Sequence, residues 1–410
     1  MKLLAVSAWF PDPPDNGSKL RAFHLLSQLA NHHDITLLSF AESNEDGDRG
    51  ALKGICREVL TVPGNPNRPT GSLRARDLIS ATPRSYVQTY SRRMQDLIDA
   101  AVPRHDAAIA LQLGSAVYLT RHATIPRVFD EAEAGVIRDQ FRTHPPGPAR
   151  WRHGLTWWKF GRFLRHLVER FERTTVVSDL ERQHLADLNC DLSAIRTVPN
   201  GVDRQSLKQK NEPRPGRLIY PGAVTYSANL EAVRFFAAEI LPLIKRARPA
   251  TFLVTGSTGS IDVADLRADG NVTFTGRVAD IAHLVAHSSV CVVPLRTGGG
   301  TRLKILEAMA LGTPVVTTTK GAEGLAVVHG ENILIADSPE AFAREVLRVM
   351  DDFVLRARLA ANGRRLVERL YTWDRIGAEF EKVLGEAQAV HRERARVPSA
   401  LAHRRWSATA

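Results

Sequence analysis

The chain of 410 residues has few cysteines, no long apolar run and no low-complexity tract. Its three cysteines, Cys56, Cys190 and Cys291, are scattered, so they provide neither a disulfide framework nor a metal-ligand spacing, and they fit a reducing cytoplasm. No run of about 18 apolar residues occurs, so no transmembrane helix is predicted. The apolar N-terminal stretch is short and ends in the proline-rich segment 10–15, which favours a first buried strand over a signal peptide.

Acidic residues are outnumbered by basic ones. The chain has 55 Lys and Arg against 44 Asp and Glu, which gives a formal net charge of +11. Such a charge favours a polyanionic partner: a nucleotide diphosphate, an anionic membrane or a nucleic acid. The basic residues do not gather beside aromatic residues in the pattern of a recognition module, so we expect no nucleic acid. A basic surface without any single partner is the alternative.

The length predicts two domains, because 410 residues are too many for one ordinary core. Strand-like and helix-like segments alternate, which favours an α/β fold with parallel sheets covered by helices on both faces. Seven strands are expected in the first half: 2–9, 34–40, 58–63, 106–112, 126–130, 174–178 and 195–199. Six are expected in the second: 217–221, 251–255, 272–275, 289–295, 314–318 and 332–335. Residues 203–217 are predicted as a polar linker, and ligands are expected in a cleft at the carboxyl ends of the strands.

The most informative segment is 294–316, where a predicted strand runs into Gly298, Gly299 and Gly300 and then into a helix. Three glycines let a ligand approach the backbone, and the helix start from Thr301 to Lys304 presents unpaired N–H groups. Arg302 and Lys304 add two full positive charges. The pattern predicts a pyrophosphate cradle, with Glu307 one turn further on to accept hydrogen bonds from sugar or ribose hydroxyls. A tight corner is the alternative, but cations at a helix start oppose the helix dipole unless an anion lies nearby.

Two further turns lead from a strand into a helix. Asn16 and Gly17 form the first, followed by Lys19 and Arg21, whose natural partner at a helix start is a phosphate; a capped helix beginning at Asn16 or Ser18 is the alternative. The second turn carries Tyr226 and Asn229, which we expect to touch the same ligand, with Asn229 equally suited to be a helix cap.

Segment 294–316 resembles the nucleotide-sugar loop of the family 4 glycosyltransferases, retaining enzymes with the two-domain GT-B architecture. Their signature is Glu, seven residues, Glu, then Ala-Met-Ala-x-Gly-x-Pro-Val-Val; here Glu307 is the second acid and Gly299 occupies the first position. The form Gly-Gly-Gly-Thr-Arg-Leu-Lys resembles a known subgroup. It lacks the carboxylate that is expected to face the donor sugar, which backbone groups or another residue must then hold.

The resemblance implies a GT-B fold: two Rossmann-like domains, at residues 1–200 for the acceptor and 201–370 for the nucleotide sugar. Pro199–Asp203 matches the domain junction of the family, and part of 371–390 is expected to pack back on the first domain. Residues 391–410 are predicted to form a basic disordered tail.

The resemblance also implies the site and the reaction. The implied activity is retaining transfer of a sugar from a nucleotide-diphosphate sugar to a glycan or lipid-linked acceptor, without a cofactor, a metal or a catalytic base. The expected catalytic residues are Arg302, Lys304 and Glu307. Donor contacts are expected from Gly17, Arg21, Tyr226, Asn229, Arg277, Gly298, Gly299, Gly300, Thr301 and Leu303. Weaker acceptor candidates are Gln112, Asp130 and Glu131, each of which can instead be structural.

Two rival functions stay open. An epimerase or hydrolase of the same fold needs an acid/base pair in the cleft, and the sequence shows none. A catalytically inactive GT-B protein that binds nucleotide or glycan, or acts as a scaffold, is favoured by Gly299 and by the lack of the Arg and Lys that many family members carry after the first strand of the second domain.

Residues 150–173 predict a basic amphipathic helix. Trp157, Phe160, Leu164, Leu167, Val168 and Phe171 form one stripe, with basic residues on the other faces. Such a helix can lie on an anionic membrane, which agrees with a cytoplasmic enzyme at the inner face of the membrane. A stripe that packs on the first sheet is the alternative, and buried aromatic stripes usually are core.

Overall fold

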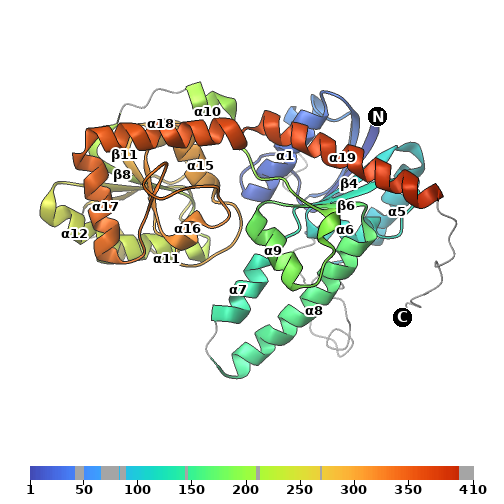
Figure 1. Ribbon diagram of the computed structural model, residues 1–410, viewed down its shortest axis with the longest axis horizontal. Coiled ribbons are helices and arrows are strands. Elements are labelled where there is room, and N and C mark those ends of the chain that lie inside the picture. The colour runs from blue at the N-terminus through green and yellow to red at the C-terminus, as the bar shows by residue number, and fades with distance from the viewer. Residues whose placement is uncertain are drawn as a thin grey trace.

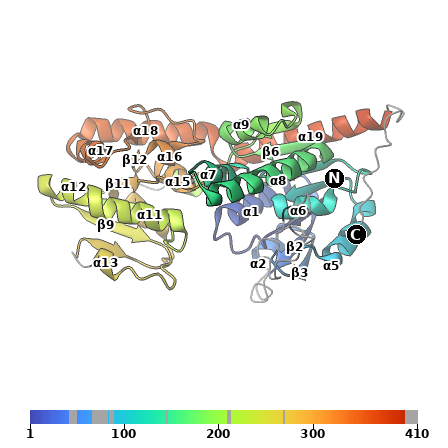
Figure 2. The ribbon, with the colours of Figure 1, turned by 90° about the horizontal axis from the view of Figure 1, so that it is seen from below.

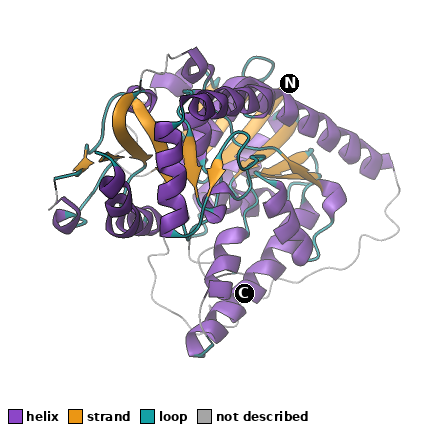
Figure 3. Ribbon diagram, turned by 60° about the vertical axis from the view of Figure 1, so that its left-hand side comes forward, coloured by secondary structure: helices purple, strands orange, loops and turns teal. Residues whose placement is uncertain are grey.

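The computed structural model describes residues 1–41, 50–65, 83, 89–143, 146–208, 213–267 and 270–396. Two α/β domains lie side by side, each built on a twisted parallel sheet (Figure 1). Figure 2 shows the same two halves from below, and Figure 3 shows helices flanking the strands of both sheets. The predicted arrangement of two Rossmann-like domains is confirmed.

The N-terminal sheet has seven strands in the order β3-β2-β1-β4-β5-β6-β7. Their bounds are β1 Lys2–Ser7, β2 Asp34–Ala41, β3 Glu58–Pro63, β4 Ala107–Leu111, β5 Arg127–Asp130, β6 Arg173–Val176 and β7 Ile195–Thr197. All the paired strands run parallel. Ser7 pairs with Leu111 and Leu111 with Asp130, so the carboxyl ends of β1, β4 and β5 lie next to each other.

Alternating residues of β1 divide the N-terminal core into two layers, because successive strand side chains point to opposite faces. Leu3 and Ala5 pack with α1 (Gly17–Leu29) and α19 (Trp373–Arg396). Leu4 and Val6 pack on the other face with α5 (Arg92–Ala101), α6 (Leu113–Leu119) and α8 (Pro148–Arg170). Helices α7 (Gly135–Thr143) and α9 (Asp179–Asp187) follow β5 and β6. Short elements are α2 (Gly50–Lys53), η1 (Val102–Arg104) and η2 (Leu192–Ala194).

The C-terminal sheet has six strands in the order β10-β9-β8-β11-β12-β13. They are β8 Arg214–Pro221, β9 Thr251–Thr255, β10 Val272–Phe274, β11 Ser288–Val293, β12 Val315–Thr317 and β13 Leu334–Ile335. The helices are α11 (Ser227–Phe235), α12 (Leu241–Ala247), α13 (Ala264–Arg267), α14 (Ile281–Ala286), α15 (Leu303–Ala310), α16 (Thr319–Ala322), α17 (Pro339–Asp351) and α18 (Phe353–Leu370). A π-helical turn, η3 (Phe236–Ile240), joins α11 to α12.

The chain crosses between the domains twice. Val202 donates its N–H to the carbonyl of Tyr371 at 2.7 Å, so the outgoing and returning segments lie together. The returning helix α19 then packs on α1, where Trp373 stacks on His24 with ring centroids 4.8 Å apart. Helix α19 continues to Arg396, so residues 391–396 are helical and not part of a disordered tail; residues 397–410 lie outside the described residues.

One other predicted segment differs from the structure, and for a second segment the structure decides between the two alternatives. The predicted linker 203–217 contains α10 (Arg204–Lys208), and β8 begins at Arg214, three residues earlier than expected, while 209–212 are not described. The aromatic stripe of 150–173 is core: Phe160, Leu164 and Leu167 are buried against the N-terminal sheet. In the described parts of the chain, no helix is long and apolar enough to cross a membrane.

Candidate active site

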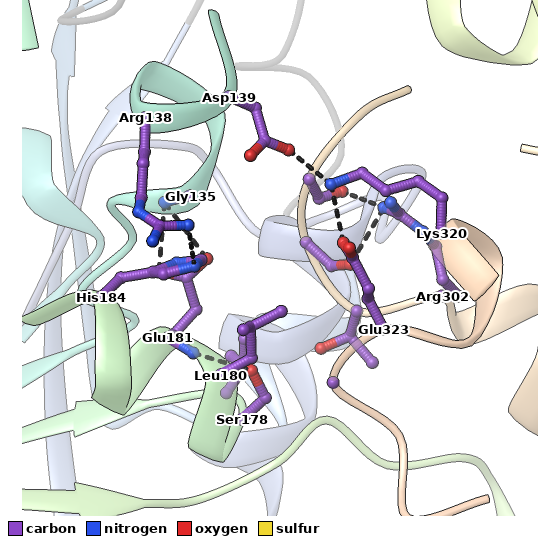
Figure 4. A pocket seen from close by; sticks show the side chains of 15 residues that line it. Gly135, Arg138, Asp139, Ser178, Leu180, Glu181, His184, Arg302, Lys320 and Glu323 are labelled. Carbon is purple, nitrogen blue, oxygen red and sulfur yellow. Dashed lines mark hydrogen bonds and ion pairs between the residues drawn. The ribbon is translucent and has the colours of Figure 1, made fainter. Parts of the chain in front are cut away.

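The carboxyl ends of the two sheets face one another across a cleft. Loops and helix starts that follow β5 and β6 meet loops that follow β11 and β12, and a pocket of about 80 Å³ lies between them. Figure 4 shows its walls: Gly135, Arg138, Asp139, Ser178, Glu181 and His184 come from the N-terminal domain, and Arg302, Lys320 and Glu323 from the C-terminal domain. Lys320 Nζ bonds to Asp139 across the cleft and to Glu323 at 2.6 Å, so an ion pair joins the domains here.

The glycine loop, residues 298–302, joins β11 to α15 and forms one wall of the pocket. Gly298 and Gly300 have φ values of +99° and +78°, a conformation that is open to glycine and costly for most other residues. A Cβ at Gly298 would lie 3.3 Å from the hydroxyl of Tyr226, so the exposed Tyr226 stands directly beside the loop. Thr301 Oγ1 is buried and has no hydrogen-bond partner among the described residues.

Arg302 lies beneath the glycine loop and holds it through hydrogen bonds. Its guanidinium donates to the carbonyl of Gly298 at 2.7 Å, to that of Gly300 at 3.0 Å and to that of Gly299. Burial lowers the pKa of Arg302, and Nε is buried without a partner in the described part of the chain. Arg302 therefore places a positive charge under the loop, and its terminal nitrogens are occupied by the carbonyls of the loop itself.

Lys304 projects from the first turn of α15 toward the turn after β8. Its Nζ donates to Tyr220 Oη at 2.8 Å and to Asn229 Oδ1 at 3.1 Å, and a Cβ at Gly222 would lie 2.8 Å from it. Burial lowers its pKa to about 7. Within the residues that the structure describes, no carboxylate forms a salt bridge with this amine, although the charge of Glu307 one turn away favours its protonated form.

Asn229 positions Lys304 and is not a helix cap. The N-cap of α11 is Tyr226, whose side chain makes no capping bond. Asn229 donates to the carbonyl of Ala223 at 2.7 Å and accepts from Tyr220 Oη at 2.6 Å, in addition to Lys304. Its amide is thereby fixed with the oxygen toward the amine. Arg277 follows β10, is exposed and has no recorded contact with this group.

Glu307 lies one turn after Lys304 on the same helix and is partly buried. Burial raises its pKa, and the nearby Lys304 opposes that effect. No hydrogen bond to another described residue satisfies its carboxylate. Leu303 lies across the cleft from Gly17, where an added Cβ would lie 3.9 Å from Leu303 Cδ1. The starts of α1 and α15 therefore approach one another closely.

Arg21 and Asp130 form a buried ion pair, which corrects the expected roles of both. Arg21 Nε and Nη2 donate to the two oxygens of Asp130 at 2.9 and 2.6 Å, and both side chains are fully buried. Arg21 Nη1 also donates to the carbonyl of Pro199 and to Asn200 Oδ1. With every nitrogen of Arg21 paired inside the protein, it ties α1 to β5 and to the domain junction and does not reach a ligand.

Gln112 and Glu131 follow the adjacent strand ends of β4 and β5, and both have positive φ values, +68° and +61°. The amide of Gln112 is buried and donates to the carbonyl of Ser18 at 3.2 Å, so it fastens α1 to β4. Glu131 accepts from Ser18 Oγ at 3.1 Å, while its Oε2 is buried without a partner among the described residues. Burial raises the pKa of Glu131 to about 8, partly offset by Arg21. Strain of this kind concentrates at functional sites.

Glu133 is a site residue that the sequence reasoning missed. A Cβ added at Gly299 would lie 3.2 Å from Glu133 Oε1 and 2.6 Å from Val136 Cγ2, so these two side chains occupy the space that a side chain at position 299 would fill. Burial and, secondarily, the nearby Glu181 raise the pKa of Glu133 to about 7, opposed by Arg302. No hydrogen bond to a described residue holds its carboxylate. The Glu131-x-Glu133 pattern after a strand was the only signal in the sequence.

Comparison with known proteins identifies what this cleft resembles. Residues 16–206 match the profile of Glycosyltransferase Family 4, and residues 215–352 match that of Glycosyl transferases group 1. A mannosyltransferase of Corynebacterium glutamicum, described as a GDP-mannose-dependent monoacylated alpha-(1-6)-phosphatidylinositol monomannoside mannosyltransferase, is 27% identical over 159 residues. That match covers 36% of this chain and 42% of the relative, so the aligned segment spans less than half of its length.

Solved structures show the fold over nearly the whole chain. HepE of Anabaena, in a crystal structure with UDP and glucose, has a TM-score of 0.69 at 15% identity, covering 94% of this chain and 99% of that one. Sucrose-phosphate synthase of Thermosynechococcus elongatus has a TM-score of 0.71 at 17% identity, covering 95% of this chain and 100% of that one.

Proposed function

The chain belongs to the glycosyltransferases of family 4 and group 1, and we propose that it moves a sugar from a nucleotide-diphosphate sugar to a glycan or lipid-linked acceptor with retention of configuration. The HepE neighbour binds UDP and UDP-glucose in its crystal structures, and the Corynebacterium relative is described as GDP-mannose-dependent. Both names support a nucleotide sugar as the donor.

The observation that carries the proposal is the buried amine of Lys304, which hydrogen-bonds to Tyr220 and Asn229 but forms no salt bridge with a described residue. A buried cation is costly unless a charge of opposite sign compensates it. Lys304 lies at the start of α15, where the helix dipole also favours an anion, and a glycine loop stands beside it. The diphosphate of a nucleotide sugar supplies the missing negative charge. Tyr220 and Asn229 hold the amine in place before the donor arrives.

In the proposed reaction, the bond between the anomeric carbon and the diphosphate oxygen breaks, and a bond to the acceptor oxygen forms on the same face of the sugar. The acceptor proton passes to the leaving diphosphate, so no separate base is needed. Lys304, the N–H groups at the start of α15 and the charge of Arg302 stabilise the leaving group. These charges are provided by the protein, which is why we propose a reaction without a metal.

Carboxylates on both sides of the cleft suit the hydroxyls of the substrate. Glu307 is proposed to accept hydrogen bonds from the ribose or sugar, and Glu133 to take the place of the carboxylate that is absent at Gly299. Glu133 comes from the N-terminal domain, so this contact forms only when the two domains are close together. Glu131, with an unpartnered oxygen near Ser18, is the proposed acceptor contact.

We further propose a cytoplasmic location at the inner face of the membrane, with an anionic membrane surface as a partner and no nucleic acid. A net charge of +11 supports an anionic partner. Among the relatives, the Corynebacterium enzyme is described as acting on a phosphatidylinositol mannoside, and a Staphylococcus aureus protein as a capsular polysaccharide biosynthesis glycosyltransferase.

A panel of nucleotide sugars tests the donor. Wild type and Lys304→Ala are incubated with UDP-glucose, UDP-galactose, UDP-N-acetylglucosamine and GDP-mannose, and the release of free diphosphate is measured. The proposal predicts slow hydrolysis of one donor, lost in Lys304→Ala and kept in the control Lys382→Ala, since Lys382 is exposed on α19. Nucleotide binding without turnover of any donor, even with added glycan acceptors, would favour an inactive binding protein instead.

A further inference from the structure

Helices α7 and α8 form a pair that projects from the N-terminal domain, as Figures 1 and 3 show. Three large apolar side chains are exposed on the outer half of α8: Trp151 is 83% exposed, Leu155 55% and Trp158 57%. Their spacing of four and three residues places them on one face of the helix. This face, Trp151–Leu155–Trp158, is called the outer face below.

The outer face is distinct from the stripe that holds α8 to the domain. Phe160, Leu164 and Leu167 are buried under the sheet, so packing of α8 does not require the outer face. At the outer end, α7 closes on α8 through Gly154, where an added Cβ would lie 3.1 Å from the ring of Phe141. Phe141 and Leu155 also line an apolar groove of about 530 Å³ between the two helices.

The segment that carries the outer face is basic, with Asp139 and Glu169 at its two ends and Glu169 paired with Arg165 at 3.7 Å. Between Gln140 and Val168 the sequence contains no Asp or Glu and six Lys or Arg residues: Arg142, Arg150, Arg152, Lys159, Arg162 and Arg165. Two of the guanidinium groups lie over aromatic rings, Arg162 over Trp158 at 5.2 Å and Arg150 over Phe141 at 5.6 Å from the centroids. Cations and exposed indoles are therefore interleaved on the same projecting element.

We propose that the α7–α8 pair docks on an anionic phospholipid bilayer, with the outer face in the headgroup region and the surrounding Arg and Lys residues on lipid phosphates. Tryptophan and arginine have the amphipathic form that the interface favours, with an apolar body and a polar or charged end. Each basic residue adds attraction to an anionic leaflet, and salt screens that attraction. If the partner of this surface were a protein instead, the chain would not bind lipid vesicles. The test below measures vesicle binding.

Docking there has a consequence for the cleft. Helix α7 connects the two places. Gly135, Arg138 and Asp139 near its start line the interdomain pocket, and Phe141 near its end lines the apolar groove. Its nine residues span on the order of 13 Å. The bilayer surface would therefore lie close to the pocket. The docking rests on the proposed membrane location, and this consequence rests in addition on the proposed transfer to a lipid-linked acceptor.

The test is co-sedimentation of the full chain with vesicles of phosphatidylcholine alone or with 30% phosphatidylglycerol. The compared proteins are wild type, the triple variant Trp151→Ser/Leu155→Ser/Trp158→Ser and the control Phe353→Ser/Val354→Ser. The control removes two apolar side chains that are equally exposed, next to Arg356, on α18 of the other domain. Thermal unfolding and turnover of a nucleotide sugar without a lipid acceptor, measured beside it, separate docking from folding and chemistry.

Wild type and the control are expected to bind the anionic vesicles at least tenfold more tightly than the neutral ones, and the triple variant at least tenfold more weakly than wild type. Raising NaCl to 0.5 M is expected to weaken wild-type binding. The docking proposal is overturned if wild type fails to bind the anionic vesicles, or if the triple variant binds them as wild type does. If wild type binds the anionic vesicles but turns over no nucleotide sugar, the result would instead contradict the proposed sugar transfer alone.

Discussion

Moving a carboxylate from Glu133 to position 299, on the other side of the cleft, tests the role of Glu133. The perturbation is Glu133→Gln, alone and together with Gly299→Glu. Gly299, unlike Gly298 and Gly300, does not have a positive φ, so its backbone can accept a side chain, but the new Cβ would lie 2.6 Å from Val136 Cγ2. All variants are therefore made with Val136→Ala, which removes that atom and serves as the reference protein.

The structure sets the expected magnitudes. A hydrogen bond to a charged group contributes about 1.5–3 kcal/mol, so Glu133→Gln should lower kcat/KM for the nucleotide sugar about ten- to a hundredfold. Gly299→Glu alone places a second carboxylate near Glu133, whose Oε1 is 3.2 Å from the new Cβ. At a separation of roughly 5 Å and an effective dielectric constant of about 20, the repulsion between the two ionised carboxylates is about 3 kcal/mol, and protonation of Glu133, whose pKa is raised to about 7, relieves part of it. This single exchange should therefore also lower kcat/KM.

Combining the two changes restores one carboxylate at the same place. The double exchange should recover at least tenfold of the lost kcat/KM, while the dissociation constant of the free nucleoside diphosphate stays within about twofold in all variants, because Lys304 is untouched. Steady-state turnover and calorimetric titration are the assays. The reasoning is refuted if Glu133→Gln leaves kcat/KM unchanged, or if its loss appears equally in diphosphate affinity.

Three further predictions follow from the charges at the site. Burial lowers the pKa of Lys304 to about 7, so at pH 8 the binding of a diphosphate should draw a proton onto the amine; titration in buffers of different ionisation enthalpy measures this uptake, and a value of zero contradicts it. Burial raises the pKa of Glu131 from 4.5 to about 8, so the folded state keeps a proton that the unfolded state releases, and stability should fall as pH rises through that window. Urea unfolding at pH 5.5 and 8.5 should show a shallower fall in Glu131→Gln, and equal falls would count against the assignment. Arg21→Met leaves Asp130 buried and unpaired and should lower the free energy of unfolding by about 3–5 kcal/mol. Urea unfolding measures this loss, and a loss under about 1 kcal/mol would contradict the prediction.

The strands were predictable because each has a strong local signal. Strands buried on both faces of a parallel sheet read as short apolar runs, such as Leu3–Val6 and Val290–Val293, bounded by turn residues. All thirteen expected strands are present in the structure, with ends that differ by a few residues. The glycine loop was equally legible, because Gly298 and Gly300 need a backbone conformation that other residues avoid.

The pairing of side chains was not predictable, because it depends on contacts between distant residues. Arg21 has the position of a phosphate ligand near a helix start, yet Asp130, 109 residues away, pairs with it. Lys304 depends on Tyr220 and Asn229, which are 84 and 75 residues away. Glu133, which faces Gly299, comes from the other domain, so the Glu131-x-Glu133 pattern could mark it as a candidate but could not pair it with Gly299.

Helix α8 carries both a core face and an exposed face, so the core interpretation of its sequence does not exclude a membrane contact. Its stripe with Phe160 and Leu164 is core, as the periodicity of a buried amphipathic helix favours. The exposed residues Trp151 and Trp158 belong to a different face, and only the projection of the α7–α8 pair from the domain makes them visible as a surface.

The central claim is that the start of α15 and the glycine loop hold a nucleoside diphosphate through Lys304. Calorimetric titration of UDP and of GDP into wild type, Lys304→Ala and the exposed control Lys382→Ala tests it most directly. We expect one of the two nucleotides to bind wild type and the control with micromolar affinity, and Lys304→Ala to bind it at least tenfold more weakly. Equal affinity in all three proteins, or no binding of either nucleotide to wild type, would contradict it.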